Sequence, residues 1–289
     1  MVKKRLVATL IIKNGIVVQS IGFKKYLPIG SPIIAVEFLN NWGIDEIIIL
    51  DIDATPQKLP LKLELYKELS KKSFVPISIG GGIKKIQDIQ SLIHHGADKI
   101  CISSEAIHKP NFIQEAVNIF GSQCIIVCLN IKKDAQENYK LCLGKDPLEM
   151  DPFDFALQIQ ELGAGEILIN NIDKDGDKEG YDISLMQKFA SLLSIPVIAL
   201  GGVGRPEHFD ELLISSEVSA LAAANFFHFF EHSVTITKSY LEKNQVDRIR
   251  LDSHFNYKDS NHDESQRLLK KEDEILSNML FEFHEKELI

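Results

Sequence analysis

Two glycine clusters in the chain have the composition and the position of phosphate-binding turns. Gly80, Gly81 and Gly82 follow one short apolar run, and Gly201 and Gly202 follow another. Backbone N–H groups of glycine can approach a phosphate closely, and the start of a following helix adds a favourable potential. The clusters therefore predict two anion-binding turns, although glycine at such a place could also serve only a tight strand-to-helix turn.

Small and hydroxyl-bearing residues end the next apolar run after each glycine cluster. Together with the glycines they would form two equivalent sites on one face, which suggests a ligand with two phosphate groups. The residues that the pattern assigns to these sites are Gly81, Gly82, Ser103, Ser104, Gly201, Gly202, Ala223, Ala224 and Asn225.

Eight short apolar runs, rich in β-branched residues, would position these turns. Amphipathic segments separate the runs, and this alternation is typical of βα units around a parallel sheet that is buried on both faces. Eight such units are the content of a (β/α)8 barrel of about 250 residues. The sequence thus predicts the α/β class and a TIM barrel, with a doubly wound sheet as the alternative. The runs are RLVATLII, DEIIILDID, VPISIGGG, DKICIS, QCIIVCLN, GEILINNID, IPVIALGG and VSALAAA.

The runs repeat at a fixed spacing. DEIIILDID begins at Asp45, and GEILINNID begins 120 residues later at Gly165. VPISIGGGI and IPVIALGGV, which begin at Val75 and Ile195, are again 120 residues apart. This spacing predicts a barrel built from two (βα)4 half-barrel repeats.

Charge and composition exclude several classes of function. The formal net charge is −9, so the chain lacks the basic footprint of a protein that binds nucleic acid or an anionic membrane. No apolar run reaches the roughly 18 residues of a membrane-spanning helix. We expect a globular cytoplasmic protein without a metal or a cofactor. The four cysteines, Cys101, Cys124, Cys128 and Cys142, lack metal-ligand spacing, and we expect reduced thiols. The first three lie in apolar runs, so we expect them to be buried in strands.

Several motifs within this framework resemble one enzyme family. The segments KNGIVV, IGGGI, FGSQCIIV, ELGAGEIL, DKDGDKEGYD, IPVIALGG and HFDELL resemble the cyclase (HisF-type) subunit of imidazole glycerol phosphate synthase. The resemblance covers about residues 2–242. It implies a glutaminase (HisH-like) partner on the amino-terminal face of the barrel, whose ammonia crosses the core to a phosphorylated small molecule at the other face.

The same resemblance implies an acid and a base that this sequence lacks. The family's cyclase reaction uses two aspartates, at the ends of the first and fifth strands, and the matching positions here are Ile11 and Asn130. Isoleucine has no titratable group, and asparagine keeps only a hydrogen-bonding amide. Losing either member of such a pair costs on the order of 100-fold in rate. The loss of both predicts that the family's own reaction is absent.

Other positions on the ligand face are partly kept. Asp175 and Gly176 match the family's pattern, so Gly176 joins the phosphate-binding set and Asp175 is a candidate substitute proton carrier. A family lysine is replaced by Gln19, and a small polar residue is replaced by Leu200. The pocket thus retains features for an anion but is rebuilt around different chemistry.

The opposite face retains the residues that the resemblance assigns to an ammonia gate. They fall at or near the starts of the first, second, fourth and sixth strands, and opposite charges could close a network around a narrow opening. Asp98 matches a residue of the family's glutaminase interface. The alternative is that these are ordinary solvent-facing charges at strand starts. The expected gate residues are Arg5, Glu46, Lys99 and Glu166.

This contrast favours one group within the superfamily. Paralogues associated with surface-polysaccharide (lipopolysaccharide) synthesis share the apolar first strand and the ALGG segment, and they are thought to work with a glutaminase-like partner and a separate sugar amidotransferase. The sequence therefore predicts an ammonia-conducting barrel that acts with an acceptor amidotransferase. A functional cyclase with Asp175 or Asp51 as the proton carrier, and a scaffold that only activates the glutaminase, stay open as alternatives.

The chain continues beyond the region of resemblance. We expect a barrel over residues 1–242 and, over residues 243–289, a polar linker followed by an amphipathic helix. The apolar stripe of that helix could pack on the barrel, on a second copy or on an acceptor enzyme. Its residues are Leu268, Leu269, Ile275, Leu276, Met279, Leu280 and Phe283.

Overall fold

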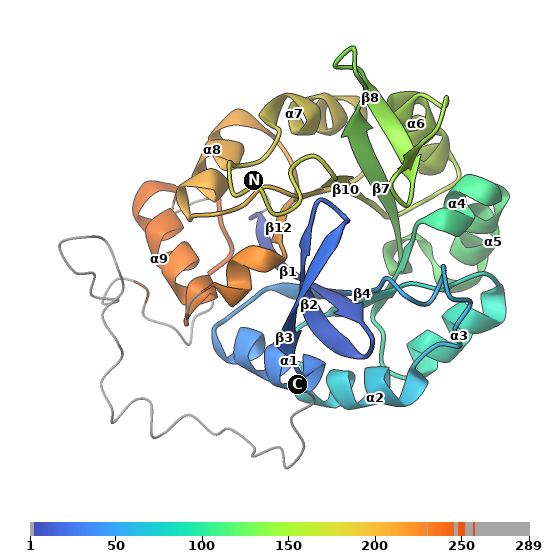
Figure 1. The fold of residues 1–289 in the computed structure, drawn as a ribbon, viewed down its shortest axis with the longest axis horizontal. Helices are drawn as coiled ribbons and strands as arrows, with labels where there is room; N and C mark the ends of the chain where they lie inside the picture. Colours follow the sequence, from blue (N-terminus) through green and yellow to red (C-terminus); the bar gives the residue numbers. More distant parts are fainter. Residues whose placement is uncertain (1–2, 230, 246–247, 252–256, 258–289) are drawn as a thin grey trace.

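The computed structural model describes residues 3–229, 231–245, 248–251 and 257, and these form a closed barrel inside a ring of helices (Figure 1). Each barrel strand pairs in parallel with its neighbours, and pairing of β10 with β7 closes the ring. The predicted (β/α)8 barrel is thereby confirmed. Its strands are β1 (Arg5–Lys13), β4 (Glu46–Asp51), β5 (Ile77–Gly80), β6 (Lys99–Ile102), β7 (Ile125–Lys133), β10 (Glu166–Asn171), β11 (Val197–Leu200) and β12 (Ala220–Ala223).

The helices cover the outside of the barrel because each has an apolar stripe to bury. Helix α6 illustrates the local signals, since Pro152 lies in its first turn and the Asp151 side chain accepts hydrogen bonds from Phe153 N and Asp154 N. The helices are α1 (Pro32–Asn41), α2 (Leu63–Lys72), α3 (Ile86–His94), α4 (Ser104–His108), α5 (Asn111–Phe120), α6 (Pro152–Glu161), α7 (Ile183–Leu192), α8 (Glu207–Ser215) and α9 (Ser233–Gln245), with short 3₁₀ turns η1 (Ser122–Cys124) and η2 (Asn225–His228).

The pairing register reproduces the repeat that the sequence spacing indicates. Strands β4 and β10 begin 120 residues apart, at Glu46 and Glu166. In β1, Ile11 pairs with Leu50 of β4, and in β7, Asn130 pairs with Asn170 of β10. Because 50 + 120 = 170, Ile11 and Asn130 hold equivalent places in the two halves of the barrel.

Two hairpins extend the strands at the carboxyl end of the barrel. β2 (Ile16–Ile21) and β3 (Lys25–Gly30) continue from β1, and the hairpin lies over the centre of the barrel in Figure 1. β8 (Tyr139–Leu143) and β9 (Asp146–Pro147) continue from β7. Both hairpins follow the first strand of a half-barrel, which is a further expression of the duplication.

Apolar residues form two separate cores, one between strands and helices and a smaller one inside the barrel. The inner core includes Cys101 and Cys128, which are buried free thiols as expected. Cys124 is also free, but it is half-buried in η1 rather than part of a strand. Its polar neighbours Ser122 and Gln123 turn the chain before β7 begins, so this part of the cysteine prediction was wrong.

The amphipathic helix expected near the carboxyl terminus lies outside the described residues. The last described segment, residues 248–251, runs beside the start of β1, where Lys4 and Ile249 form a bridge. Within the described part of the chain, no helix is both long and apolar enough to cross a membrane.

Candidate functional site

Four charged side chains form a closed ring at the end of the barrel where the strands begin. Arg5 Nη1 lies 2.6 Å from Glu46 Oε2, and Arg5 Nη2 lies 2.5 Å from Glu166 Oε2. Lys99 Nζ completes the ring at 3.0 Å from Glu46 Oε1 and 2.6 Å from Glu166 Oε1. Every cation thus contacts both carboxylates. We call Arg5, Glu46, Lys99 and Glu166 the basal ring.

The basal ring is withdrawn from solvent, and its charges depend on one another. The Glu46 side chain is only 2% exposed, so the alternative of ordinary solvent-facing charges fails for this residue. Burial alone would raise the pKa of Glu166, but hydrogen bonds and charge contacts with Arg5 and Lys99 hold that pKa below its ordinary value. Burial would likewise lower the pKa of Arg5, and the two carboxylates instead raise it.

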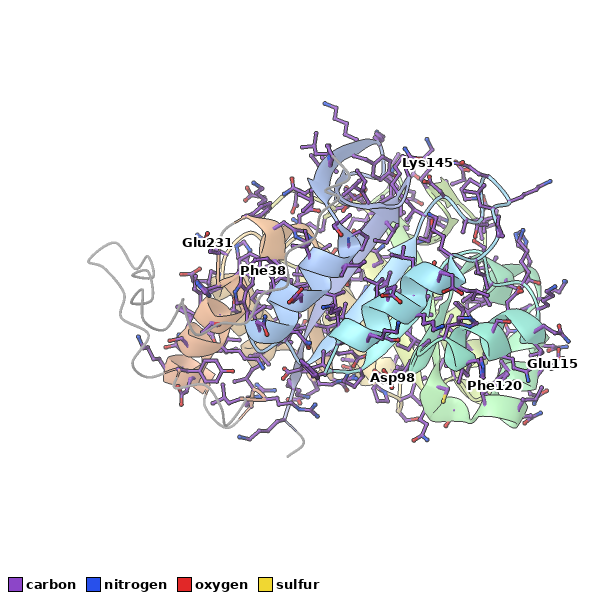
Figure 2. The ribbon with its side chains drawn as sticks, turned by 90° about the horizontal axis from the view of Figure 1, so that it is seen from below. Phe38, Asp98, Glu115, Phe120, Lys145 and Glu231 are labelled. Carbon is purple, nitrogen blue, oxygen red and sulfur yellow. The ribbon has the colours of Figure 1, made fainter. Side chains whose placement is uncertain are left out.

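Asp98 lies beside the basal ring, at the same end of the molecule. Figure 2 shows it near the bottom of the view, whereas Lys145, in the turn between β8 and β9, lies at the top. Asp98 is exposed, and one of its oxygens accepts a hydrogen bond of 2.8 Å from Ile77 N. The carboxylate therefore anchors the start of β5 while facing solvent.

The inside of the barrel near the carboxyl ends of the strands is lined by apolar and amide side chains at the positions where the resemblance implies other residues. Ile11 is 9% exposed and Leu200 is 4% exposed, so one side of this region is apolar. On the other side Asn170 Nδ2 donates to Asn130 Oδ1 at 3.1 Å. The amide of Asn130 is held by a second amide, and neither can transfer a proton as a carboxylate would.

Asp175 fastens the β2–β3 hairpin. Its Oδ2 accepts hydrogen bonds from Ser20 Oγ at 2.6 Å and from Phe23 N at 3.0 Å, and its carbonyl accepts one from Gly22 N at 2.9 Å. Burial raises the pKa of Asp175, and these hydrogen bonds oppose that rise. The carboxylate proposed as a substitute proton carrier therefore has a clear structural task.

Asn225 holds the same hairpin from the other side. Its Oδ1 accepts from Ser20 N at 3.1 Å, and its Nδ2 donates to Ser20 O at 2.6 Å. The side chain assigned to phosphate binding is thus engaged with backbone, and any contact with an anion would fall to the main chain. Ser20, which the sequence predictions did not include, is the residue that Asp175 and Asn225 share.

The glycine turns have positive φ angles in both half-barrels. Gly81 and Gly201 have φ of 110° and 115°, and Gly82 and Gly202 have φ of 73° and 101°. A Cβ atom at Gly201 would lie 2.8 Å from Asn171 O, and one at Gly82 would lie 2.8 Å from the Ala54 Cβ. Turn geometry and close packing therefore both require glycine, which is the alternative stated for these positions.

The other predicted anion-binding residues surround the same end of the barrel. Ser103 and Ser104 open α4, whereas Ala223 ends β12 and Ala224 precedes η2. Gly176 has φ of 81° and packs against the hairpin, because a Cβ there would lie 2.9 Å from Ser20 O. The fold brings both predicted anion sites to one face, where they remain a prediction.

Ion pairs stabilise the loops around this face. Asp51 Oδ2 accepts from Lys62 Nζ at 2.7 Å, and Asp53 Oδ1 accepts from Lys13 Nζ at 2.8 Å. Burial raises the pKa of Asp53, but the hydrogen bonds from Lys13 and from Asn14 N, together with the charges of Lys13 and Lys62, lower it overall. Asp51, the other candidate proton carrier, is therefore already paired with a cation.

The hairpin could have been found from the sequence, whereas the role of Ser20 could not. IVVQSI and KYLPIG are two short runs that contain β-branched or aromatic residues, and the three residues between them include Gly22, which is a hairpin signal. The signal gives the hairpin but not its position, because Asp175 and Asn225 lie 155 and 205 residues away from Ser20.

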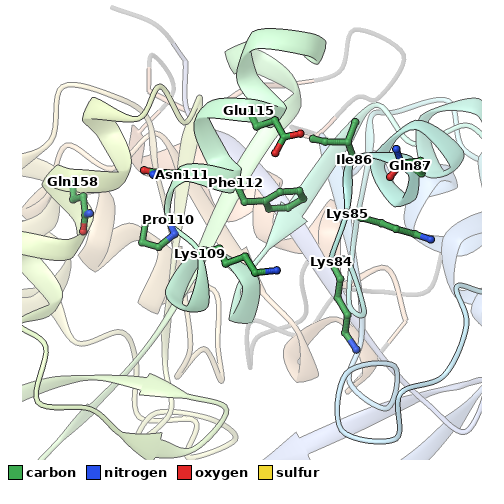
Figure 3. A pocket seen from close by; sticks show the side chains of 10 residues that line it. All are labelled: Lys84, Lys85, Ile86, Gln87, Lys109, Pro110, Asn111, Phe112, Glu115 and Gln158. Atoms are coloured by element: carbon green, nitrogen blue, oxygen red, sulfur yellow. The ribbon is translucent and has the colours of Figure 1, made fainter.

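A surface pocket of about 660 Å³ lies outside the barrel, beside the starts of α3 and α5 (Figure 3). Lys84, Lys85 and Lys109 line it together with Phe112 and Glu115. None of the predicted site residues belongs to this pocket. Among the described residues, no cluster of three or more His, Cys, Asp or Glu side chains could hold a metal ion.

Comparison with known proteins identifies a consistent set of relatives. A family model described as "Histidine biosynthesis protein" matches residues 5–233. The chain is 42% identical over 259 residues to the "Putative imidazole glycerol phosphate synthase subunit hisF2" of Vibrio vulnificus, covering 89% of this chain and 94% of that protein. It is 39% identical over 246 residues to "Imidazole glycerol phosphate synthase subunit HisF" of Clostridium botulinum, covering 84% and 97%. The subunit HisF of Staphylococcus carnosus is 38% identical over 250 residues, covering 86% and 98%.

Proposed function

Because this chain belongs to the histidine biosynthesis protein family, and within it to the HisF-type subunits of imidazole glycerol phosphate synthase, we propose that it is the ammonia-conducting subunit of a glutamine amidotransferase complex. In this proposal a glutaminase docks where the strands begin and releases ammonia into the barrel. The ammonia leaves at the opposite end for an acceptor enzyme, and the barrel itself does not perform the cyclase reaction.

The contrast between the two ends of the barrel carries this proposal. At one end four charged residues close the lumen in a complete hydrogen-bonded ring. At the other end Ile11 and an amide-paired Asn130 occupy the places of the family's acid and base. A buried ring of four charges is costly to desolvate, and a role in opening the lumen would explain why it is kept.

Exposed apolar side chains support docking at the end with the basal ring. Phe74 precedes β5 and is 90% exposed, and Ile119 and Ile214 lie in the last turns of α5 and α8 with exposures of 56% and 64%. Helices end at the face where strands begin, so all three lie on the same side of the molecule. The three side chains lie on separate elements around the ring, so a partner that covers this whole end of the barrel would bury them.

The alternative of a functional cyclase has a specific difficulty. Its substitute proton carriers would be Asp175 or Asp51, and both carboxylates already accept hydrogen bonds from other side chains. Asp175 Oδ2 accepts two hydrogen bonds from the hairpin, and Asp51 is bound by Lys62 at 2.7 Å. A general base must reach a substrate proton within hydrogen-bond distance, and each carboxylate already has one oxygen engaged, by the hairpin or by Lys62.

The acceptor in our proposal is a sugar, as in the paralogues associated with surface polysaccharide that the first strand and the ALGG segment resemble. The apolar side of the outlet, at Ile11 and Leu200, fits a role in passing a neutral molecule onward. The glycine turns and Ser103 would bind a phosphorylated small molecule that orders the outlet. We propose a separate amidotransferase as the partner at this end.

The first test is cyclase turnover by the purified full-length chain with the bisphosphate substrate of the family reaction and excess ammonium salt. Ammonium removes the need for a glutaminase. We expect no product above the uncatalysed rate, and robust product formation would contradict the conduit proposal. An active HisF-type subunit assayed in parallel verifies the substrate, and circular dichroism verifies that the barrel is folded.

The second test measures glutamine hydrolysis by a HisH-like glutaminase from the same cell, with and without this chain. We expect binding and increased hydrolysis. Absence of both would exclude the conduit and the scaffold. The conduit and the scaffold are separated with an Arg5→Met variant, which removes the ion pairs of Arg5 with Glu46 and Glu166. The delivery of ammonia to the acceptor should change in this variant for a conduit and stay the same for a scaffold.

A further inference from the structure

The surface pocket beside the starts of α3 and α5 is lined by residues that neither end of the barrel uses. We call it the lateral pocket. Its volume of about 660 Å³ falls within the roughly 300–1,000 Å³ of pockets that hold small molecules. Figure 3 shows the Phe112 ring in the middle of the lining side chains, with Lys84 and Lys109 below it and Glu115 above it. The lateral pocket is therefore large enough for a ligand of its own.

Lysines dominate the charge of the lateral pocket. Its lining has three cations and one anion, namely Lys84, Lys85 and Lys109 against Glu115. The whole chain carries a formal net charge of −9, so this local excess of positive charge runs against the composition of the protein. A cleft lined mainly by one sign of charge focuses the electrostatic field and raises the local concentration of oppositely charged ligands. The lining therefore favours an anion.

The turn that carries Lys84 and Lys85 is fixed by the protein itself. Asp88 Oδ2 accepts hydrogen bonds from Lys84 N at 2.9 Å and from Lys85 N at 3.1 Å. The side chains of Lys84 and Lys85 have no ion pair among the described residues. Lys109 instead pairs with Glu105 at 3.0 Å. Two lysine side chains on a fixed turn are therefore available to a ligand.

The remaining lining suits a molecule with hydroxyl groups and an apolar face. Asn111 and Gln158 carry side-chain amides that both donate and accept hydrogen bonds, and the Glu115 carboxylate accepts them. Phe112 is 7% exposed, and its ring supplies an apolar surface to the pocket. Sugar rings combine hydroxyl groups with apolar C–H faces, which pack on such surfaces. Inorganic phosphate has no such face, and the charge of Glu115 would repel it.

We propose that the lateral pocket is a binding site for a sugar phosphate, with the phosphate group held by Lys84, Lys85 and Lys109 and the sugar hydroxyls bound by Glu115 and Asn111. Lysine ammonium groups on flexible side chains bind phosphate as point charges, so the three need no fixed geometry before the ligand arrives. The site is separate from the anion-binding turns predicted at the carboxyl ends of the strands. It does not depend on the proposed function, because no step of ammonia transfer uses it.

The site is located by NMR titration of the full-length chain with glucose 6-phosphate, followed through backbone amide shifts. Amides of residues 84–87 and 111–112 should shift together and reach saturation. Gly202 and Ala224 report separately on the anion site predicted at the carboxyl ends of the strands. Inorganic phosphate should bind to the lateral pocket several-fold more weakly, and uncharged glucose should not shift these amides.

Lys84→Gln combined with Lys85→Gln tests the cations. Loss of two lysines that contact a phosphate should weaken the binding of glucose 6-phosphate about tenfold or more. The matched control is Lys67→Gln with Lys71→Gln, which removes the same charge from exposed positions on α2. Because solvent and salt screen distant surface charges, the control should stay within about twofold of the wild-type affinity. All four side chains are exposed, so both variants should fold as the wild type does.

Glu115→Ala tests the contact with the sugar. The substitution removes a charge that repels phosphate and an acceptor for hydroxyl groups. The ratio of the affinities for glucose 6-phosphate and inorganic phosphate should therefore fall several-fold. Glu64→Ala, at an exposed position in the first turn of α2, should keep the wild-type ratio.

Several results would overturn the site. They are absence of binding, amide shifts confined to Gly202 and Ala224, equal weakening in the two lysine pairs, and an affinity ratio that Glu115→Ala leaves unchanged. The titrations contain no glutaminase, so none of these results bears on the proposed function. Failure of this chain to stimulate a glutaminase would, in turn, leave the lateral pocket unaffected.

Discussion

The two ends of the barrel lumen differ in how their polar groups are used. At the basal ring, every charged group contacts two groups of opposite charge, and the cations lie on different strands from the carboxylates. At the other end, where the strands finish, the Ile11 side chain has no polar atom, and the ionisable Asp175 accepts hydrogen bonds that hold the β2–β3 hairpin. One end therefore contains a closed network of ion pairs, and the other contains polar side chains that hold the scaffold in place.

This difference distinguishes residues that stabilise the fold from residues that indicate a function. The glycine turns, Asp175 and Asn225 all have structural contacts that explain their presence without a substrate. The basal ring has no comparable explanation, because apolar residues of similar volume would fill a barrel end at lower desolvation cost. The basal ring is therefore the better indication of function.

The largest effect is expected when the basal ring loses one carboxylate. Glu46→Ala leaves Arg5 and Lys99 buried with only Glu166, and removal of one partner from a buried charge pair costs about 3–5 kcal/mol. Urea unfolding of wild type and variant measures the change. Glu217→Ala is the control, since its ion pairs with Lys4 and Arg248 involve a side chain that is 68% exposed. The control should lose no more than about 1 kcal/mol, and equal losses would mean that the ring is not a special feature.

A smaller loss of stability is expected in the β2–β3 hairpin, at the carboxyl ends of the barrel strands. Ser20→Ala removes the hydrogen bond from Ser20 Oγ to Asp175, which is worth about 1.5–3 kcal/mol for a bond to a charged group. Amide hydrogen exchange should become faster in β2 and β3 while the barrel strands keep their protection. Ser91→Ala, which removes an exposed bond to the Gln87 carbonyl, serves as the control. If S20A and S91A showed the same amide exchange rates in β2 and β3, Ser20 would not stabilise the hairpin.

The docking surface should affect binding rather than folding. Phe74→Ser exchanges a side chain that is 90% exposed, so the free energy of unfolding should change by less than about 0.5 kcal/mol. If the glutaminase covers Phe74, its affinity should fall by about tenfold, as for a side chain worth over 1 kcal/mol in an interface. Leu27→Ser, on the hairpin at the other end, should leave that affinity unchanged. Titration calorimetry measures both, and a loss of affinity in L27S alone would place the docking surface at the outlet.

The smallest effects are opposite dependences on pH. The folded pKa of Glu166 is lowered, so its contribution to stability is present above the ordinary glutamate pKa and is lost as pH falls through the folded value. The folded pKa of Asp175 is raised, so its contribution is present below the ordinary aspartate pKa and is lost as pH rises through the folded value. The pH dependence of unfolding in Glu166→Gln and Asp175→Asn should therefore differ from wild type in opposite directions. Slopes that change in the same direction would contradict the contrast between the two ends.

Sequence by itself determined the barrel and its duplication. Apolar runs and amphipathic segments are local patterns, and a spacing of 120 residues is visible without coordinates. The same local reasoning placed Arg5, Glu46, Lys99 and Glu166 at or near strand starts, where a closed barrel must bring them to one end. The family resemblance then identified Ile11 and Asn130 as departures from the expected acid and base.

Only the tertiary structure decided how these residues are used. The ring distances depend on side chains from β1, β4, β6 and β10 meeting across the lumen, and the hairpin is held by residues far from Ser20 in the chain. Local patterns specify which face of an element is buried, whereas partners and burial arise from contacts between distant segments.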